Sequence, residues 1–155
     1  MLRRRLLLPI VSTLVLCASP ARADADPSCR LNEEDFFKQL WTMTDWKAIY
    51  SGFKRTVPIC SDEGEHAGDY SVVVVHAFAR YWTQLLELQN LMASDPEFRK
   101  FVFRHIDMTA HRADLDLTLE NATEKCPVGA TALCKEIATS AASAIKTYEK
   151  FWAAL

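Results

Sequence analysis

The chain has 155 residues, of which 18 are Lys or Arg and 20 are Asp or Glu, giving a formal net charge of −2. This length suits one domain with a hydrophobic core and is too short for two domains of ordinary size. Nucleic-acid binding requires a basic surface, and the acidic balance argues against that function.

The segment Met1–Ala23 has the three-part pattern of a secretory signal peptide. Three arginines at positions 3–5 precede an apolar stretch, and the small-residue site Ala21-Arg22-Ala23 follows it. The apolar stretch is too short for a permanent membrane span. We therefore expect cleavage after Ala23 and a periplasmic or secreted product, with residues 24–155 as a single helical domain. A lipoprotein signal at Cys17 is the alternative, although Leu16 stands where such signals carry a small residue.

Removal of the signal peptide would make the protein more acidic. Four of the 18 basic residues lie within it and no acidic residue does, so 14 basic and 20 acidic residues remain, a net charge of −6. Such a charge keeps an exported protein soluble. It also suits attraction to a basic protein partner.

Four cysteines follow the signal peptide: Cys29, Cys60, Cys126 and Cys134. An even number of cysteines in an exported protein predicts disulfides, and four cysteines allow three pairings. We favour Cys29–Cys60 with Cys126–Cys134 because this choice closes the shortest loops, each bond being worth about 2–4 kcal/mol. No CxxC spacing is present, so the sequence predicts neither a zinc site nor another metal or cofactor.

The first two predicted helices precede a charged loop. Asn32 can cap a short helix, and Thr44 or Asp45 can cap a second one. Apolar residues at helical spacing follow each cap, and Pro58 ends the second helix. The segment Ile59–Gly68 contains two glycines and four ionisable side chains, a composition typical of a loop.

The longest apolar stretch after the signal peptide runs from Asp69 to Met92, and we predict one helix there. Its polar side chains recur at steps of three and four, which places them on one narrow stripe. This stripe consists of His76, Arg80, Thr83, Glu87 and Asn90. The remaining surface is apolar, so the helix is expected at the centre of a bundle. Four valines at positions 72–75 favour a buried strand instead, but the pattern is longer than a strand.

The next helix begins with a clear boundary. Asp95 can cap it, and Pro96 suits its first position. A bend is expected at residues 107–110, with Thr109 as a candidate cap for the helix that follows.

Apolar residues at steps of three and four across residues 130–155 predict a long amphipathic helix. The predicted fold is therefore an all-α bundle of about five or six helices. The four tryptophans are expected in its core: Trp41, Trp46, Trp82 and Trp152.

The loop before the predicted central helix is the first candidate site. It gathers Asp62, Glu63, Glu65 and His66. Hard cations bind oxygen-rich loops, but this spacing is not that of a calcium loop and no second histidine lies nearby. Loops held by a scaffold often carry recognition, so these four residues are predicted to contact a protein partner.

Two further groups contain a histidine with charged neighbours. One is the polar stripe, with His76, Arg80, Glu87 and Asn90. The other is Asp107, His111 and Asp114, which share a face if the helix there is unbroken. Either group offers a general base or a metal ligand. No Ser or Cys nucleophile lies beside a base in the sequence, so we predict no catalytic residue.

In overall plan the chain resembles the periplasmic immunity proteins that bacteria make against secreted cell-wall-degrading effectors. The shared features are the signal peptide ending Ala21-Arg22-Ala23, the four later cysteines and the helical spacing. The resemblance implies a binding protein that blocks a partner without catalysis, with Asp62–His66 as the blocking loop. The alternative is a small periplasmic enzyme or ligand-binding protein that uses the polar stripe.

Overall fold

In a computed structural model, the described part of the chain comprises residues 38–58, 62 and 65–155. A helical turn at residues 38–41 precedes α2 (Trp46–Thr56), α3 (Glu65–Arg80), η1 (Trp82–Gln84), α4 (Leu85–Ser94), α5 (Pro96–Arg104), α6 (Arg112–Glu124) and α7 (Thr131–Trp152). These ranges contain no strand, so the all-α prediction is confirmed for them, and the four valines lie in α3. Among these helices, none combines the length and apolarity that crossing a bilayer requires.

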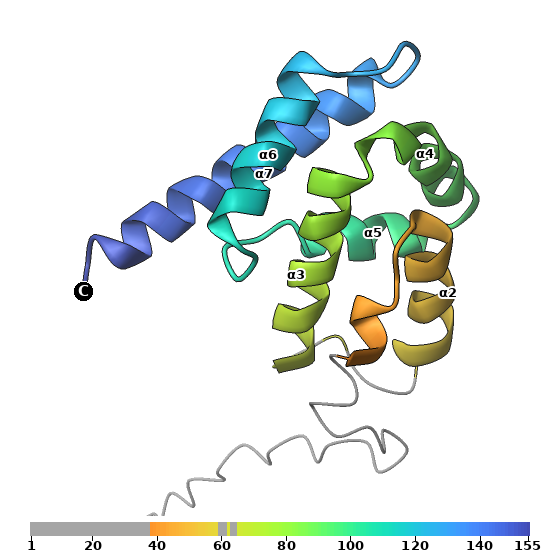
Figure 1. Ribbon diagram of the computed structural model, residues 1–155, viewed down its shortest axis with the longest axis horizontal. Coiled ribbons are helices and arrows are strands. Elements are labelled where there is room, and N and C mark those ends of the chain that lie inside the picture. The colour runs from red at the N-terminus through yellow and green to blue at the C-terminus, as the bar shows by residue number, and fades with distance from the viewer. Residues whose placement is uncertain (1–37, 59–61, 63–64) are drawn as a thin grey trace, which may run out of the picture.

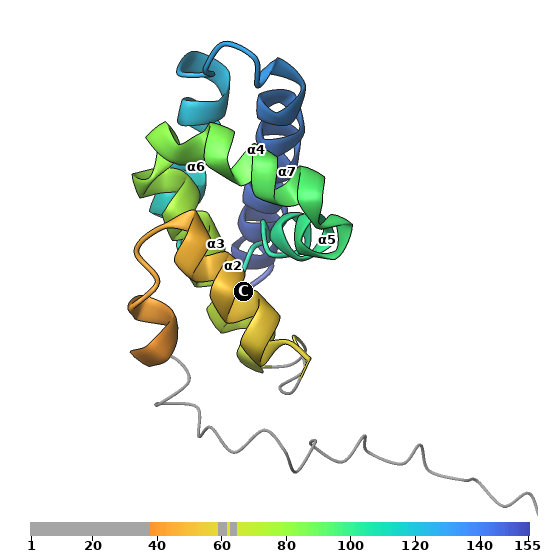
Figure 2. The same ribbon diagram turned by 90° about the vertical axis from the view of Figure 1, so that its right-hand side faces the viewer.

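The helices pack as two groups that meet at α3 (Figure 1). α6 and α7 form an antiparallel pair, and α3 lies against α6. α4 packs against both α2 and α5, as Figure 2 shows from the side. The C-terminal end of α7 extends past the beginning of α6 and projects from the rest of the molecule (Figure 1).

The buried apolar side chains form one cluster to which every α-helix contributes. Its largest fully buried members are Trp46, Phe78, Phe98, Leu40, Leu85, Leu88, Leu115 and Ile137. The rings of Trp46 and Phe78 lie 4.7 Å apart, joining α2 to α3. Phe53 similarly joins α2 to α5, with its ring 5.3 Å from that of Phe98.

The prediction of one continuous helix from Asp69 to Met92 is wrong. α3 ends at Arg80, η1 follows, and α4 begins at Leu85. Tyr81, with φ −111° and ψ 31°, leaves the α-helical conformation between them. The change of direction lets α3 pack on α6 while α4 packs on α2 and α5. A single straight helix that is apolar on most sides would need neighbours on most sides along its whole length.

Of the four predicted caps, two are confirmed, one is wrong, and Asn32 lies outside the described residues. Asp45 accepts a hydrogen bond from the backbone of α2, and Asp95 accepts two from the backbone of α5, whose first residue is Pro96. Asp95 is also bound by Lys54, which lowers the pKa of the aspartate. The prediction of Thr109 as a cap is wrong, because α6 begins after His111. The predicted bend at residues 107–110 is present.

The tryptophans were predicted as core residues, and the structure separates them. Trp46 is fully buried, and Trp82 is half-buried against the core. Trp41 and Trp152 are 40% and 56% exposed, so the prediction is wrong for both. Periodicity places a side chain on a helix face, but burial also requires a neighbouring element at that height.

The predicted bond between Cys126 and Cys134 is confirmed, with an S–S distance of 2.01 Å. Cys29 and Cys60 lie outside the described residues, as do the expected signal peptide and Cys17. Their pairing and processing therefore stay predictions.

Candidate protein-binding site

The predicted acidic loop is described only in part, and Asp62 is engaged within the protein. Its carboxylate accepts two hydrogen bonds from Arg104 Nη1, at 3.0 and 3.1 Å. Glu65 and His66 belong to the first turn of α3 and not to a loop, which corrects the prediction, and His66 is half-buried. Glu63 lies outside the described residues. The ion pair with Arg104 leaves Asp62 with less free charge for a partner.

A buried polar network lies beside Asp62, between α3 and the end of α5. Ser71 Oγ lies 2.9 Å from Asp107 Oδ2, 2.9 Å from the Ala67 carbonyl oxygen and 3.1 Å from His105 Nδ1. Because a hydroxyl has one proton and two of these atoms only accept, the geometry suits His105 Nδ1–H donating to Ser71. His105 Nε2 then lies 3.6 Å from Asp62 Oδ2, without a hydrogen-bond partner among the described residues.

This network contains serine, histidine and aspartate, but it is not arranged as a catalytic triad. In a triad the aspartate orients the histidine and the histidine accepts the serine proton. Here the aspartate oxygen accepts from the serine instead. Ser71 is completely buried and His105 is 1% exposed, so no substrate reaches either. The network therefore serves to join α3 to the segment after α5.

The unfolding free energy is expected to fall as pH drops below 6.5. Burial lowers the pKa of His105 from its usual 6.5, with Asp62 and Asp107 opposing the shift and Arg104 assisting it. The unfolded chain therefore binds this proton at a higher pH than the folded chain does, and stability is lost through the interval between the two pKa values. Urea unfolding at a series of pH values checks this, with His105→Gln expected to flatten the dependence.

His111→Gln is the matched control for that measurement, because His111 is exposed and follows the same helix. It is expected to keep the pH dependence of the unmodified protein. An unchanged slope in His105→Gln would assign the dependence to other groups.

The two other predicted groups meet in the structure, because His76 of the polar stripe lies beside Asp114 of the second group. His76 Nδ1 in α3 lies 3.1 Å from Asp114 Oδ2 in α6, and Arg80 Nη2 lies 3.7 Å from Asp114 Oδ1. The Trp41 ring stands edge-on to His76, with 5.1 Å between ring centroids. An aspartate can orient a histidine as a general base. The side chains gathered here include no Ser or Cys nucleophile, so an interhelix contact is the simpler function.

The remaining stripe residues lie elsewhere, so the prediction of one continuous stripe is wrong. The turn at Tyr81 places Glu87 and Asn90 on α4. Asn90 is exposed there. Glu87 pairs with Lys47 of α2 at 2.5 Å, and the hydrogen bond raises the pKa of that lysine.

Asp107, His111 and Asp114 also fail to share a helix face, because α6 begins only at Arg112. Asp107 Oδ1 instead accepts hydrogen bonds from the backbone N and the hydroxyl of Thr109, at 2.8 and 2.6 Å. His111 is exposed at the start of α6, and Asp114 faces α3. The bend therefore gives the three side chains different partners.

Among the large apolar side chains of the described residues, the most exposed one lies in the turn between α6 and α7. Val128 is 98% exposed. We call residues 125–130 the clipped loop, because the bond from Cys126 to Cys134 ties it to the first turn of α7. Gly129 has φ +90°, a conformation that glycine adopts without steric cost. The loop forms the tip of the α6–α7 pair (Figure 1).

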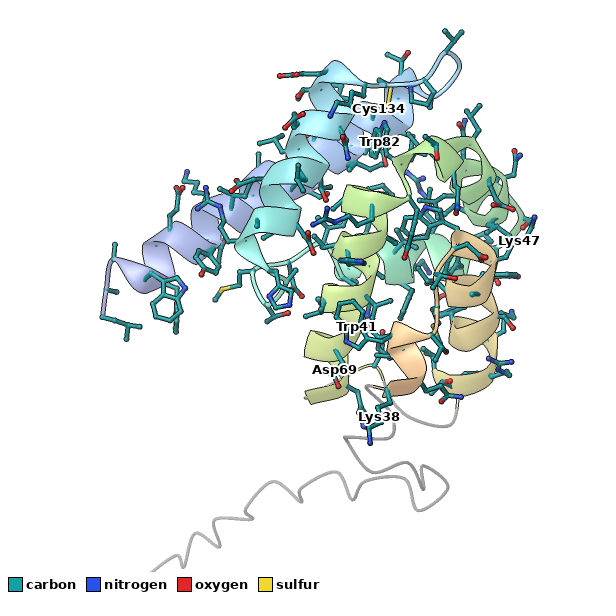
Figure 3. All side chains as sticks on the ribbon, in the orientation of Figure 1. Lys38, Trp41, Lys47, Asp69, Trp82 and Cys134 are labelled. Atoms are coloured by element: carbon teal, nitrogen blue, oxygen red, sulfur yellow. A yellow bond between two sulfur atoms is a disulfide. The ribbon has the colours of Figure 1, made fainter. Side chains whose placement is uncertain are left out.

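Hydrogen bonds from η1 and α4 hold the clipped loop on its other side, and the part of α6 just before it is bonded to α3. Trp82 Nε1 donates to the Lys125 carbonyl at 2.7 Å, and Gln89 Nε2 donates to the Gly129 carbonyl at 3.5 Å. Figure 3 shows Trp82 beside the end of α7 that carries Cys134. Asn121, just before the loop, donates to the Phe78 carbonyl at 3.3 Å. The loop is therefore anchored at both ends while its apolar tip is in solvent.

Sequence reasoning placed a disulfide around this turn but did not select it as a binding site. The available signal was a Pro-Val-Gly turn between two cysteines, with an apolar residue at its centre. The charged side chains of residues 62–66 favour the acidic segment instead.

Comparison of the chain with protein-family models, curated proteins and solved structures gave no match.

Proposed function

We propose that this protein is an exported inhibitor of the immunity type, which binds a secreted cell-wall-degrading protein and blocks it without catalysis. The observation that carries the proposal is the clipped loop, whose apolar tip at Val128 is exposed while both of its ends are anchored. The acidic charge and the signal-like N-terminus agree with an envelope protein that meets a basic partner.

A rigid projecting loop is well suited to blocking an active-site cleft. A segment that is already ordered loses little conformational entropy on binding, so more of its contact energy appears as affinity. An exposed apolar side chain gains free energy when it enters a cleft and leaves water. The predicted loop at Asp62 lacks this advantage, because its carboxylate already binds Arg104.

The test is inhibition of peptidoglycan hydrolysis by cell-wall hydrolases secreted by the same organism, measured by release of material from isolated sacculi. We expect the protein to inhibit one hydrolase at near-equal stoichiometry. Val128→Asp is expected to weaken the complex by about 2 kcal/mol or more, roughly thirtyfold, because the change puts an unpaired charge in a desolvated contact. Isothermal titration with the inhibited hydrolase measures this loss.

Leu155→Asp is the matched control, since Leu155 is 84% exposed at the other end of α7. It is expected to leave the affinity unchanged. Inhibition that survives Val128→Asp would contradict the assignment of the clipped loop. Absence of inhibition across the secreted hydrolases would contradict the proposed function.

A second candidate function rests on the hydrogen bond between His76 and Asp114, which orients the imidazole as a base would require. It is an enzyme that acts at the α3–α6 face. This candidate predicts a turnover activity that His76→Asn abolishes and Val128→Asp leaves unchanged. The two substitutions therefore separate the two functions.

A further inference from the structure

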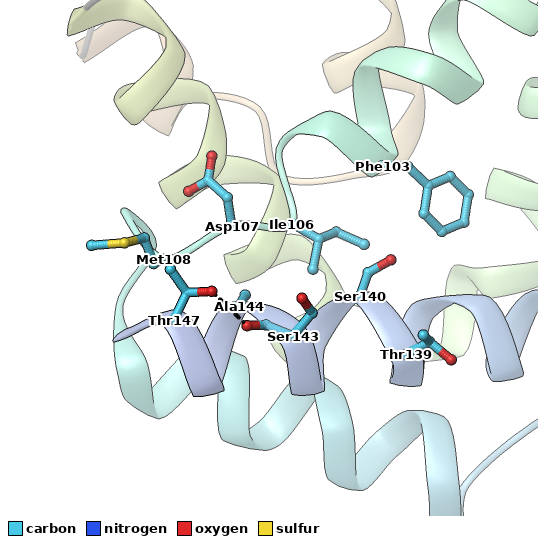
Figure 4. Close-up of a pocket in the computed structure, with 9 residues that line it drawn as sticks. All are labelled: Phe103, Ile106, Asp107, Met108, Thr139, Ser140, Ser143, Ala144 and Thr147. Atoms are coloured by element: carbon cyan, nitrogen blue, oxygen red, sulfur yellow. Dashed lines mark hydrogen bonds between the residues drawn. The ribbon is translucent and has the colours of Figure 1, made fainter. Parts of the chain in front are cut away.

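The α5–α6 connection (residues 105–111) touches α3 on one side and a cavity along α7 on the other. Towards α3, the side chains of His105 and Asp107 are both hydrogen-bonded to Ser71. Towards α7, the connection forms one wall of a cavity of about 420 Å³. Figure 4 shows Ile106 and Asp107 on this wall, across from the hydroxyl-bearing side chains of α7. A change in the bonds to Ser71 would therefore also move a wall of this cavity.

The position of His105 suits a neutral imidazole and not a charged one. The residue is 1% exposed, and its Nδ1 is bonded to Ser71. Its Nε2 lies 3.6 Å from Asp62 Oδ2, which is too far for a hydrogen bond. Arg104 already bonds both oxygens of that carboxylate. A proton added at Nε2 would therefore put a positive charge in the interior without a full partner, which costs free energy.

The charged and titratable groups around this ring oppose one another. Asp62 and Asp107 attract a positive imidazole, whereas Arg104 at the end of α5 repels one. Tyr70 of α3, whose ring centroid is 5.5 Å from that of His105, adds no charge, because burial raises the pKa of its hydroxyl. Burial outweighs the two carboxylates, so the pKa of His105 lies below its usual 6.5.

We infer that the α5–α6 connection is a proton-sensitive junction, in which a proton taken up by His105 detaches residues 105–111 from the start of α3. In the open state the imidazolium is hydrated, which its buried position in the closed state does not allow. Opening of one junction requires less free energy than unfolding of the whole domain, so it precedes the global loss of stability in acid. The displaced wall then changes the shape of the cavity along α7. The inference does not depend on the proposed function.

The experiment is amide hydrogen exchange of the full-length gene product, purified as the cell processes it and followed by NMR. Measurements run from about pH 8 to about pH 5.5, the range in which histidine is the side chain that ordinarily titrates. The backbone amides of His105, Thr109 and Ala110 are suitable probes, because each donates a hydrogen bond in the structure. The reference is the amide of Ile137, a fully buried residue of α7. Protection factors remove the direct effect of pH on the exchange reaction.

The probes in the connection are expected to be less protected than Ile137 at every pH, because they exchange through a local opening. Their protection is expected to fall in acid by up to about tenfold per pH unit, since opening is linked to one proton. Protection at the connection that is constant or rises in acid would overturn the inference. Protection equal to that of Ile137 would also overturn it, because the connection would then open only when the whole domain unfolds.

Two variants assign the response to His105. His105→Gln removes the titrating ring and is expected to make protection at the connection independent of pH. Arg104→Gln leaves the core intact, since the Arg104 side chain is 55% exposed. It removes the cation that opposes protonation, so it is expected to raise the pH at which the His105 imidazole resonance titrates and to reduce the loss of protection in acid. It decides the matter if His105→Gln does not fold.

Arg99→Gln is the matched control, because it makes the same change on α5 at a residue that pairs with Glu136. It is expected to keep the pH response of the unmodified protein. The imidazole resonances of the four histidines show which ring titrates with the loss of protection. A response that follows His66 at the start of α3, persists in His105→Gln or is equal in the two arginine variants would overturn the inference.

Discussion

Replacing Trp46 with alanine is expected to lower the free energy of unfolding by about 3–5 kcal/mol. The side chain is fully buried, and its ring packs 4.7 Å from that of Phe78. Its loss would leave a cavity between α2 and α3, which the surrounding helices can close only in part. Urea unfolding should show a lower midpoint with an unchanged slope, because the surface exposed on unfolding is nearly the same.

Trp152→Ala is the control, since it makes the same change of side chain where Trp152 is 56% exposed. A surface substitution of this kind is expected to change stability by less than about 0.5 kcal/mol. Equal losses in the two variants would contradict the position of Trp46 at the centre of the core. The comparison also tests the finding that the four tryptophans differ in burial.

Removing the disulfide with the double substitution Cys126→Ser and Cys134→Ser is expected to cost about 2–3 kcal/mol of stability. The bond closes a short loop, with a sequence separation of 8, so it restricts the unfolded chain less than a long-range bond would. Thermal unfolding with and without a reducing agent measures the loss. In the double variant the reducing agent should have no further effect at this bond.

The same double substitution separates loop rigidity from loop chemistry. Trp82 still holds one end of the clipped loop through the Lys125 carbonyl, but the tie to α7 is gone. Affinity for the partner should therefore fall while Val128 remains in place, because the loop must be ordered on binding. Val128→Asp should show the converse, with weaker binding and unchanged stability. Unchanged affinity after loss of the disulfide would contradict a rigid blocking loop.

Most helices of this protein could be predicted from local pattern. Asp95 and Pro96 predicted the start of α5, and Thr44 or Asp45 predicted the start of α2. Such predictions succeed because capping involves residues within one turn of each other. The long α7 followed from apolar residues at steps of three and four. The bend after α5 was also predicted, although its cap was placed at Thr109, before the observed start of α6.

The break at Tyr81 could not be predicted in the same way. No Gly or Pro lies between Asp69 and Met92, so nothing local requires the helix to stop. Gln84, just after the break, accepts a hydrogen bond from the backbone N of Trp46 at 3.4 Å. That partner comes from another helix, 38 residues away.

The predicted sites also differ from those in the structure because their partners are distant in the sequence. The acidic segment is a candidate site because Asp62 is charged, but Arg104, 42 residues further along, pairs with that charge. His76 and Asp114 were assigned to separate groups and are hydrogen-bonded across 38 residues. Pairings between distant residues depend on how helices pack and not on the spacing within any one of them.

Local composition and periodicity were therefore enough to predict the all-helical character of the described residues, the starts of α2 and α5 and the bond from Cys126 to Cys134. They sufficed because helix propensity, capping and short-range disulfide closure involve residues that are near one another in the chain. Tertiary packing alone decided the break at Tyr81, the burial of each tryptophan and the exposure of Val128. Each of these depends on whether another helix covers a given face, and that is a property of the assembled fold.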